Sequence, residues 1–216
     1  AGRPPGDPMT RPDAAALWPV YRRAMAVGAR ALAPHLVRFG RIAPRGELVD
    51  LGGADGTLAF QLARMVPGLA VTVVDRAVNA DAFHARRAEL DAPVAARFCA
   101  ADLQEPGGLG PLLAEAGVIV ASNVMHLLAP AQRDRLLAAI HAHAPPGCKL
   151  LVYDQFVSRD RVDSASCLIV DWLLCGHRFD CSEAEFAAEL TGRYAEVRHK
   201  RVPGLPGAMV AGVVAR

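Results

Sequence analysis

The chain has 216 residues, of which 52% are hydrophobic and 21% are charged, and its formal net charge at pH 7 is +2. This composition is typical of one folded domain with a large core, and it argues against a disordered chain and against a second full domain. The basic residues are scattered and no apolar run approaches the ~20 residues of a membrane-spanning helix, so we expect neither a nucleic-acid nor a membrane partner.

The five cysteines are odd in number, widely spaced and free of any C-x-x-C pair. Such a pattern is typical of reduced thiols, which predicts a cytoplasmic protein whose cysteines pack in the interior. Two histidines, His141 and His143, lie two residues apart near the end of a predicted helix and would diverge on it. We therefore predict no metal site.

The first elements of the chain are a Pro- and Gly-rich lead and a helix. Residues 1–12 are interpreted as a flexible lead or a remnant left by cloning. Residues 13–45 carry apolar side chains at spacings of three and four, which predicts a helical segment that packs on the core. Pro34 is expected to kink this segment or split it in two.

A strand, a tight turn and a helix are predicted over residues 47–66. The apolar run Leu48-Val49-Asp50-Leu51 ends at Gly52, Gly53 and Gly56, and an apolar-periodic segment follows. Glycines let the backbone take positive φ and let a ligand approach the main chain, next to the free N–H groups of a helix start. The turn should bind something small. The dinucleotide spacing G-x-G-x-x-G fails at Ala54 and Thr57.

The remaining pattern predicts a doubly wound sheet. Further strands are expected over residues 69–74, 94–98, 118–121 and 148–154, and helices over residues 131–143, 163–175 and 182–190. Residues 194–199 and 209–214 flank a Pro-Gly-rich turn and predict a terminal antiparallel hairpin. The fold class is therefore α/β, a Rossmann-like sheet that is mostly parallel with an antiparallel C-terminal hairpin.

Three polar residues follow predicted strands. Asp75 lies 19 positions after Gly56, where doubly wound folds place a carboxylate that binds ribose hydroxyls, although it could instead cap the next turn. Asp102 could accept a hydrogen bond from an adenine amino group, with Leu103 against the ring. His126 sits at the carboxyl end of a central strand, which favours a functional over a structural histidine.

The glycine turn carries a family resemblance. Asp50, Gly52, Ala54 and Gly56 fit acidic-x-Gly-x-small-x-Gly, which resembles the first motif of class I S-adenosylmethionine (SAM) methyltransferases. The longer string Val49 to Gly56 is close to the Val-Asp-x-Gly-Gly-Gly-x-Gly of the small-molecule O-methyltransferases of the plant caffeate and acetylserotonin type, which bacteria also use for natural products. The resemblance covers residues 17–216 by order of elements. A glycine-rich turn from another doubly wound enzyme is the alternative on the turn alone.

The resemblance implies a SAM-binding domain over residues 46–216 and assigns its site residues. Those implied to bind the cofactor are Asp50, Gly52, Gly53, Gly56, Asp75, Arg76, Asp102, Leu103, Asn123 and Met25. Those implied to contact the acceptor are Tyr21, Met125, Phe156, Trp172 and His177.

His126 occupies the place of the family's general base. The Asp-Trp pair that follows the histidine in the family is Leu127-Leu128 here. Asp180 falls on the family's glutamate that orients the histidine, in a segment whose spacing is longer than the family pattern. Both residues are predicted to be catalytic.

The function predicted is methyl transfer from SAM to a hydroxyl of a small acceptor, an aromatic natural product. The alternatives are a SAM-binding relative that acts on N or C or catalyses a reaction without methyl transfer, and a non-catalytic subunit of a heteromeric enzyme. Family members usually carry an N-terminal dimerisation domain, which is missing from this sequence. We therefore expect an excised domain, a minimal protein that forms a homodimer in another way, or a partner chain that supplies that domain.

Overall fold

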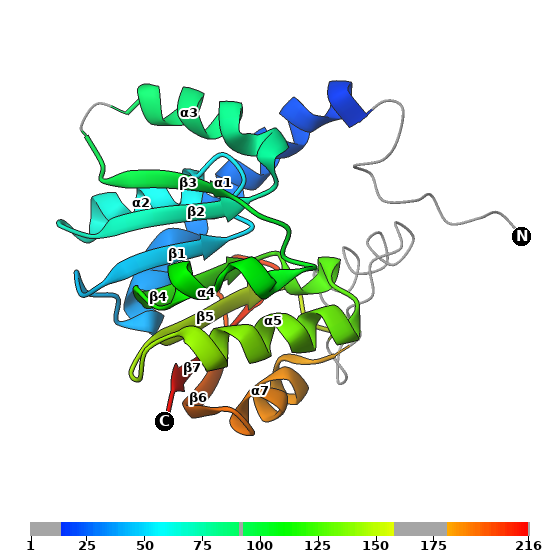
Figure 1. Ribbon diagram of the computed structural model, residues 1–216. Helices are drawn as coiled ribbons and strands as arrows, with labels where there is room; N and C mark the ends of the chain where they lie inside the picture. The colour runs from blue at the N-terminus through cyan, green and yellow to red at the C-terminus, as the bar shows by residue number, and fades with distance from the viewer. Residues whose placement is uncertain (1–13, 91–92, 158–180, 216) are drawn as a thin grey trace, which may run out of the picture.

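The computed structural model describes residues 14–90, 93–157 and 181–215, which contain a seven-stranded sheet in the order β3-β2-β1-β4-β5-β7-β6 (Figure 1). Strands β1 to β5 are parallel, whereas β7 is antiparallel to both β5 and β6. The predicted fold class is confirmed. The strands are β1 Glu47–Leu51, β2 Ala70–Asp75, β3 Ala96–Ala100, β4 Ala116–Ser122, β5 Lys149–Asp154, β6 Tyr194–Arg201 and β7 Ala208–Val214.

Helices cover both faces of the sheet, with α5 in front of the strands and α1 behind them (Figure 1). One hydrophobic cluster joins the sheet to α4, α5 and α7, and a second joins it to α1, α2 and α3. No helix of the described part is long and apolar enough to cross a membrane. The α-helices are α1 Ala14–Gly40, α2 Thr57–Met65, α3 Ala80–Ala88, α4 Gly110–Leu113, α5 Pro130–His143 and α7 Glu183–Thr191, and the short 3-10 helices are η2 Ala77–Asn79, η3 Pro106–Gly108 and η4 Met125–Leu127.

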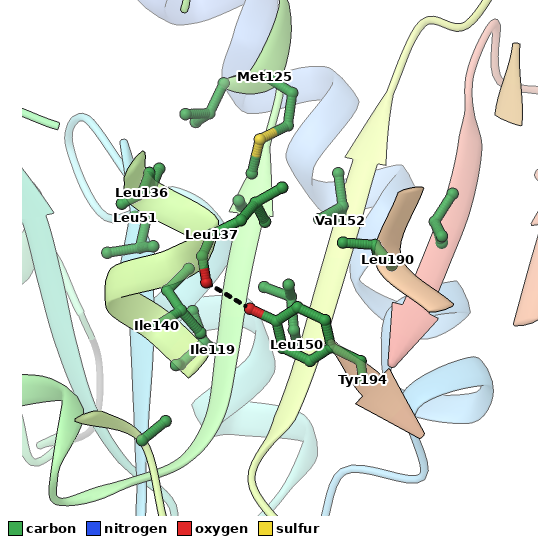
Figure 2. Packing of buried hydrophobic residues seen from close by; sticks show 14 of the residues in the cluster. Leu51, Ile119, Met125, Leu136, Leu137, Ile140, Leu150, Val152, Leu190 and Tyr194 are labelled. Carbon is green, nitrogen blue, oxygen red and sulfur yellow. Dashed lines mark hydrogen bonds between the residues drawn. The ribbon is translucent and has the colours of Figure 1, made fainter. Parts of the chain in front are cut away.

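The first cluster ties the C-terminal hairpin to α5 (Figure 2). Tyr194 at the start of β6 is 3% exposed, and its hydroxyl donates a 2.9 Å hydrogen bond to the carbonyl oxygen of Leu137 in α5. Burial raises the pKa of Tyr194, so this hydroxyl stays protonated and the bond remains a neutral one. The hairpin thereby packs against the same layer as Ile140 and Leu190.

Helix α1 continues through Pro34 without a break, so of the two predicted outcomes the split is wrong, and the kink stays a prediction. Leu32, Ala33 and Leu36 are buried against the sheet, whereas Pro34 is exposed and its ring projects away from the core. The hydrogen bond that proline cannot donate is lost, but packing of the buried face holds the helix together. The predicted elements at residues 1–12 and 163–175 lie outside the described residues.

The other predicted elements agree with the structure to within about two residues. Ser182 and Glu185 form the expected capping box of α7, with the Ser182 hydroxyl accepting from the Glu185 N–H at 3.2 Å and Glu185 Oε2 accepting from the Ser182 N–H at 2.7 Å. Strand β3 lies two residues later than predicted, because its pairing with β2 begins at Val71 opposite Ala96. Helix α3 was not predicted.

Candidate functional site

The candidate site lies at the carboxyl ends of β1, β4 and β5, which are neighbours in the sheet. The chain runs from β1 outward to β2 and β3, then returns to the other side of β1 at β4. Ligands of open α/β sheets bind where the strand order reverses in this way. Of the residues predicted for the site, the glycines follow β1 and His126 follows β4. Asp75 instead ends β2, and Asp102 follows β3.

The glycine turn after β1 has little room for larger residues. Gly52 and Gly56 have φ of +73° and +78°, which favours glycine. A Cβ atom added to Gly52 would lie 2.5 Å from Val124 Cγ2, and one added to Gly53 would lie 2.5 Å from Asp50 Oδ2. Both glycines are therefore required by their neighbours, and both are half-buried. Ala54 also takes positive φ, of +49°, at the position where the family usually has glycine.

Asp75 at the end of β2 holds the glycine turn. Its Oδ2 accepts a 2.7 Å hydrogen bond from the Ala54 N–H. Its Oδ1 accepts from the Arg76 N–H at 2.7 Å and from Asn79 Nδ2 at 2.9 Å. The turn-capping role that was the alternative for Asp75 is thus present. Ribose binding stays a prediction, for which each carboxylate oxygen still offers lone pairs.

Three residues at the strand ends carry buried oxygen atoms with no hydrogen-bond donor among the described residues: both carboxylate oxygens of Asp50, Oδ1 of Asn123 and Oε1 of Gln155. Asp50 is 1% exposed, and burial raises its pKa to about 8. The nearby Asp75 and Asp55 charges add to the shift, and the main chain of Ala59 opposes it. An unsatisfied buried polar group costs about 1–3 kcal/mol, so such groups are rare in folded proteins. Their position on three adjacent strands is what a polar ligand site requires. Gln155 was not predicted from the sequence.

His126 in η4 is held by a buried aspartate, Asp154, at the end of β5. Its Nδ1 lies 2.8 Å from Asp154 Oδ1, and the two residues are 2% and 0% exposed. Asp154 Oδ2 accepts from the Met125 N–H at 2.9 Å and the His126 N–H at 3.3 Å, and Oδ1 also accepts from the Gln155 N–H at 2.8 Å. A carboxylate fixed by three main-chain donors orients the imidazole ring in one position. This arrangement can hold a general base.

Sequence reasoning missed Asp154 and assigned the orienting role to Asp180, which lies outside the described residues. The signal for Asp154 was its place as the last residue of a strand, the same signal that identified Asp75. The structure therefore supplies an orienting carboxylate that the sequence analysis did not name.

Other predicted cofactor residues lie around the turn. Leu103 approaches Gly52, since its Cδ1 would be 3.7 Å from a Cβ placed there. Asp102 is exposed, and its Oδ1 accepts from the Gln104 N–H at 2.9 Å. Arg76 is exposed and Met25 is half-buried on α1.

Of the predicted acceptor contacts, Met125 and Phe156 are 0% and 1% exposed within the first hydrophobic cluster. Both therefore pack in the core in this structure. Tyr21 lies on α1, but its side chain, like all of Trp172 and His177, is outside the described part. No group of three or more His, Cys, Asp or Glu residues that could hold a metal occurs in the described ranges.

Comparison with known proteins finds a family match over the strand-end residues. Residues 49–150 match the family model of a methyltransferase domain. Residues 49–150 are therefore similar to a methyltransferase domain. The match begins within β1 and takes in the glycine turn, Asp75, Asp102 and His126.

The chain is similar to O-methyltransferases in particular. It is 34% identical over 124 residues to the tetracenomycin polyketide synthesis 8-O-methyl transferase of Streptomyces glaucescens, covering 57% of this chain and 35% of that protein. It superposes on the mitomycin 7-O-methyltransferase with a TM-score of 0.71 at 26% identity, covering 95% of this chain and 59% of the other. With human N-acetylserotonin methyltransferase in complex with SAM, the TM-score is 0.72 at 18% identity, over 91% and 55% of the two chains.

These findings agree with the predicted resemblance to O-methyltransferases, and the superpositions show the same fold. The chain spans about a third of the first curated relative and a little over half of these two solved structures. The residues present fit SAM, because a half-buried glycine turn follows β1 and the buried Asp50 oxygens beside it form no hydrogen bond with a described side chain.

Proposed function

We propose that this methyltransferase domain transfers a methyl group from SAM to a hydroxyl oxygen of a small aromatic acceptor. The observation that carries the proposal is the His126–Asp154 pair, which lies on the same edge of the sheet as the glycine turn. A cofactor-binding turn and an oriented base at adjacent strand ends are the two parts that such a reaction needs. The O-methyltransferase names of the relatives support the choice of oxygen.

The cofactor would be held by the residues around the turn. Gly52 and Gly53 would let its methionine part approach the main chain, and the Asp50 carboxylate would pair with its ammonium group. Asp75 would accept hydrogen bonds from the ribose hydroxyls, with Asp102 and Leu103 at the adenine. When bound, SAM supplies an electrophilic methyl group on a positively charged sulfur.

His126 would act on the acceptor. Because Asp154 is acceptor-only when ionised, Nδ1 carries the hydrogen that lies between them, and the base would be the lone pair on Nε2. That lone pair would take the proton from the acceptor hydroxyl while its oxygen attacks the methyl group in line. A phenol of pKa ~10 and an imidazole of pKa ~6.5 need only partial proton transfer in the transition state. General-base help of this kind contributes roughly 10²–10⁴ in rate, and alignment of the reactants contributes more.

The test is a mass-shift screen with SAM that carries a deuterated methyl group. The purified chain is incubated with a panel of phenols, anilines and polyketide scaffolds, and products are analysed by mass spectrometry and NMR. The expected product carries one labelled methyl group on oxygen. A product labelled on nitrogen or carbon, an isomerised product of unchanged mass, or no product with any acceptor although SAM binds would contradict the proposal.

A further inference from the structure

A second concave site lies away from the strand ends, between the end of α1 and strand β6. It has a volume of about 340 Å³. Four of its lining residues are the cations Arg38, Arg41, Arg198 and Lys200, and its apolar part includes Phe39 and Met209. We call it the basic groove. Its volume is in the range of small-molecule sites.

The sheet topology explains why this groove is open. Arg198 and Lys200 pair across the hairpin with Ala211 and Met209, so all four side chains belong to one face of the sheet. Met209 and Ala211 pack in the same cluster as Leu36 of α1. Helix α1 therefore covers this face as far as β7, and no described helix covers it over β6.

Two cations near the groove bind main-chain carbonyl oxygens at the C-terminal end of α1. Arg198 donates a 2.6 Å hydrogen bond to the Phe39 carbonyl oxygen, and Lys149 Nζ donates to the carbonyl oxygens of Gly40 at 3.0 Å and Arg41 at 2.8 Å. These contacts satisfy the last carbonyl groups of the helix, where positive charge is favoured. Arg198 and Lys149 therefore have a structural role at the end of this helix.

The other cations of the groove have no such role. Arg38, Arg41 and Lys200 are exposed and form no ion pair with a described residue. The pKa of Lys149 is lowered, first by burial and then by the positive charges of Arg198 and Arg41, with Glu196 opposing the shift. The C-terminal end of α1 therefore carries more positive charge than the nearby Glu196 neutralises.

The apolar wall adds a second requirement on the ligand. Met209 is 2% exposed, and the Arg198 guanidinium carbon lies 4.9 Å from the centre of the Phe39 ring. A planar cation stacked on an aromatic ring presents its other face for a further stacked ring. The groove therefore combines anion-binding groups with a surface for an apolar ring.

We propose that the basic groove binds a small organic anion that combines an aromatic ring with a phosphate or carboxylate group. Both anions share the same recognition chemistry, which is charge-assisted hydrogen bonding to arginine and lysine. The proposal goes beyond methyl transfer and does not depend on it. The competing explanation is that Arg198 and Lys200 only protect the edge strand β6 from pairing with other chains.

The test is calorimetric titration of the full chain with naphthyl phosphate, naphthoate and inorganic pyrophosphate, with excess S-adenosylhomocysteine present. The double variant R38Q/K200Q is compared with R64Q/R87Q, which removes the same charge from exposed sites on α2 and α3. We expect naphthyl phosphate or naphthoate to bind wild type and R64Q/R87Q alike, and R38Q/K200Q at least about tenfold more weakly, with pyrophosphate weaker than the ring-bearing anion. The comparison of phosphate with carboxylate then identifies the preferred anion.

Three results would overturn the proposal. If none of the three anions binds, the remaining explanation for Arg198 and Lys200 is that they protect the edge strand β6. Equal weakening in both double variants would mean non-specific charge attraction. Pyrophosphate binding as tightly as naphthyl phosphate would remove the role of the ring. Thermal unfolding of the variants, whose substituted residues are all exposed, serves as the check that each has folded.

Discussion

The two halves of the strand-end site are built in different ways. The cofactor half follows β1 and β2 and consists of a glycine turn that is fixed by its backbone conformation and by Asp75. The carboxylate oxygens of Asp50 beside this turn form no hydrogen bond with a described side chain. The acceptor half, after β4 and β5, centres on a histidine already bound to Asp154, 28 residues away in the chain. In the proposed function, the first half binds the cofactor and the second moves a proton.

This difference implies that substitutions in the two halves should change different measured quantities. Changes in the acceptor half should lower kcat with SAM affinity retained, whereas changes in the cofactor half should lower SAM affinity or alter folding stability. The four predictions below test that separation, from the largest expected effect to the smallest.

His126→Ala removes the proposed base. Turnover with an accepted acceptor should fall by roughly 10²–10⁴, while the SAM dissociation constant stays within about twofold, because the glycine turn is untouched. Steady-state kinetics and calorimetry measure the two quantities. His84→Ala, an exposed histidine on α3, is the matched control and should retain full activity. Wild-type turnover in His126→Ala would remove the base assignment.

Asp154→Asn should lower kcat by roughly 10–100-fold, because an amide does not hold the imidazole in one tautomer as a carboxylate does. Nitrogen NMR of the His126 ring checks the cause directly. Wild type should show hydrogen on Nδ1, and the variant should show a mixture of tautomers. An unchanged tautomer together with unchanged turnover would assign Asp154 to structure alone.

Gly52→Ala should weaken SAM binding by about tenfold or more and destabilise the fold by roughly 1–3 kcal/mol. The residue has φ of +73°, and the new methyl group would lie 2.5 Å from Val124 Cγ2. Gly28→Ala on α1 is the control, since no atom lies within 4 Å of its added Cβ, and it should stabilise by about 0.5–1 kcal/mol. Equal SAM affinity in wild type and Gly52→Ala would mean that the turn does not bind the cofactor.

Asp50 should make stability depend on pH. Its pKa is about 8 in the folded protein and near 3.8 without burial, so the folded state keeps a proton that the unfolded chain releases. The contribution of Asp50 to the free energy of unfolding is therefore fully present below pH ~4 and is lost as pH rises toward ~8. Between pH ~6 and pH ~9, the unfolding free energy of wild type should fall by roughly 2 kcal/mol more than that of Asp50→Asn. Urea unfolding measures this, with exposed Asp102→Asn as control, and equal falls in wild type and Asp50→Asn would contradict it.

The parts of the structure that local sequence specifies were predicted well. The glycine turn, Asp75 and the Ser182–Glu185 capping box depend on residues close in the chain, and each is where the pattern placed it. Element order and the terminal hairpin followed from alternating apolar runs and turn residues.

The parts that depend on tertiary packing were not predicted. Asp154 becomes an orienting residue only because β5 lies beside β4, and nothing local distinguishes it from any aspartate at a strand end. The start of β3 depends on its register with β2, and the continuity of α1 through Pro34 depends on burial of Leu32 and Leu36. The basic groove is likewise formed by α1 and β6, which are far apart in sequence.

The central claim, that His126 and Asp154 act as one catalytic unit, is tested most directly by kcat of the H126A/D154N double variant at saturating SAM. If Asp154 works only through His126, the double variant should be no slower than His126→Ala, within about threefold. If the two single reductions multiply in the double variant, Asp154 acts independently of His126 and the claim is contradicted.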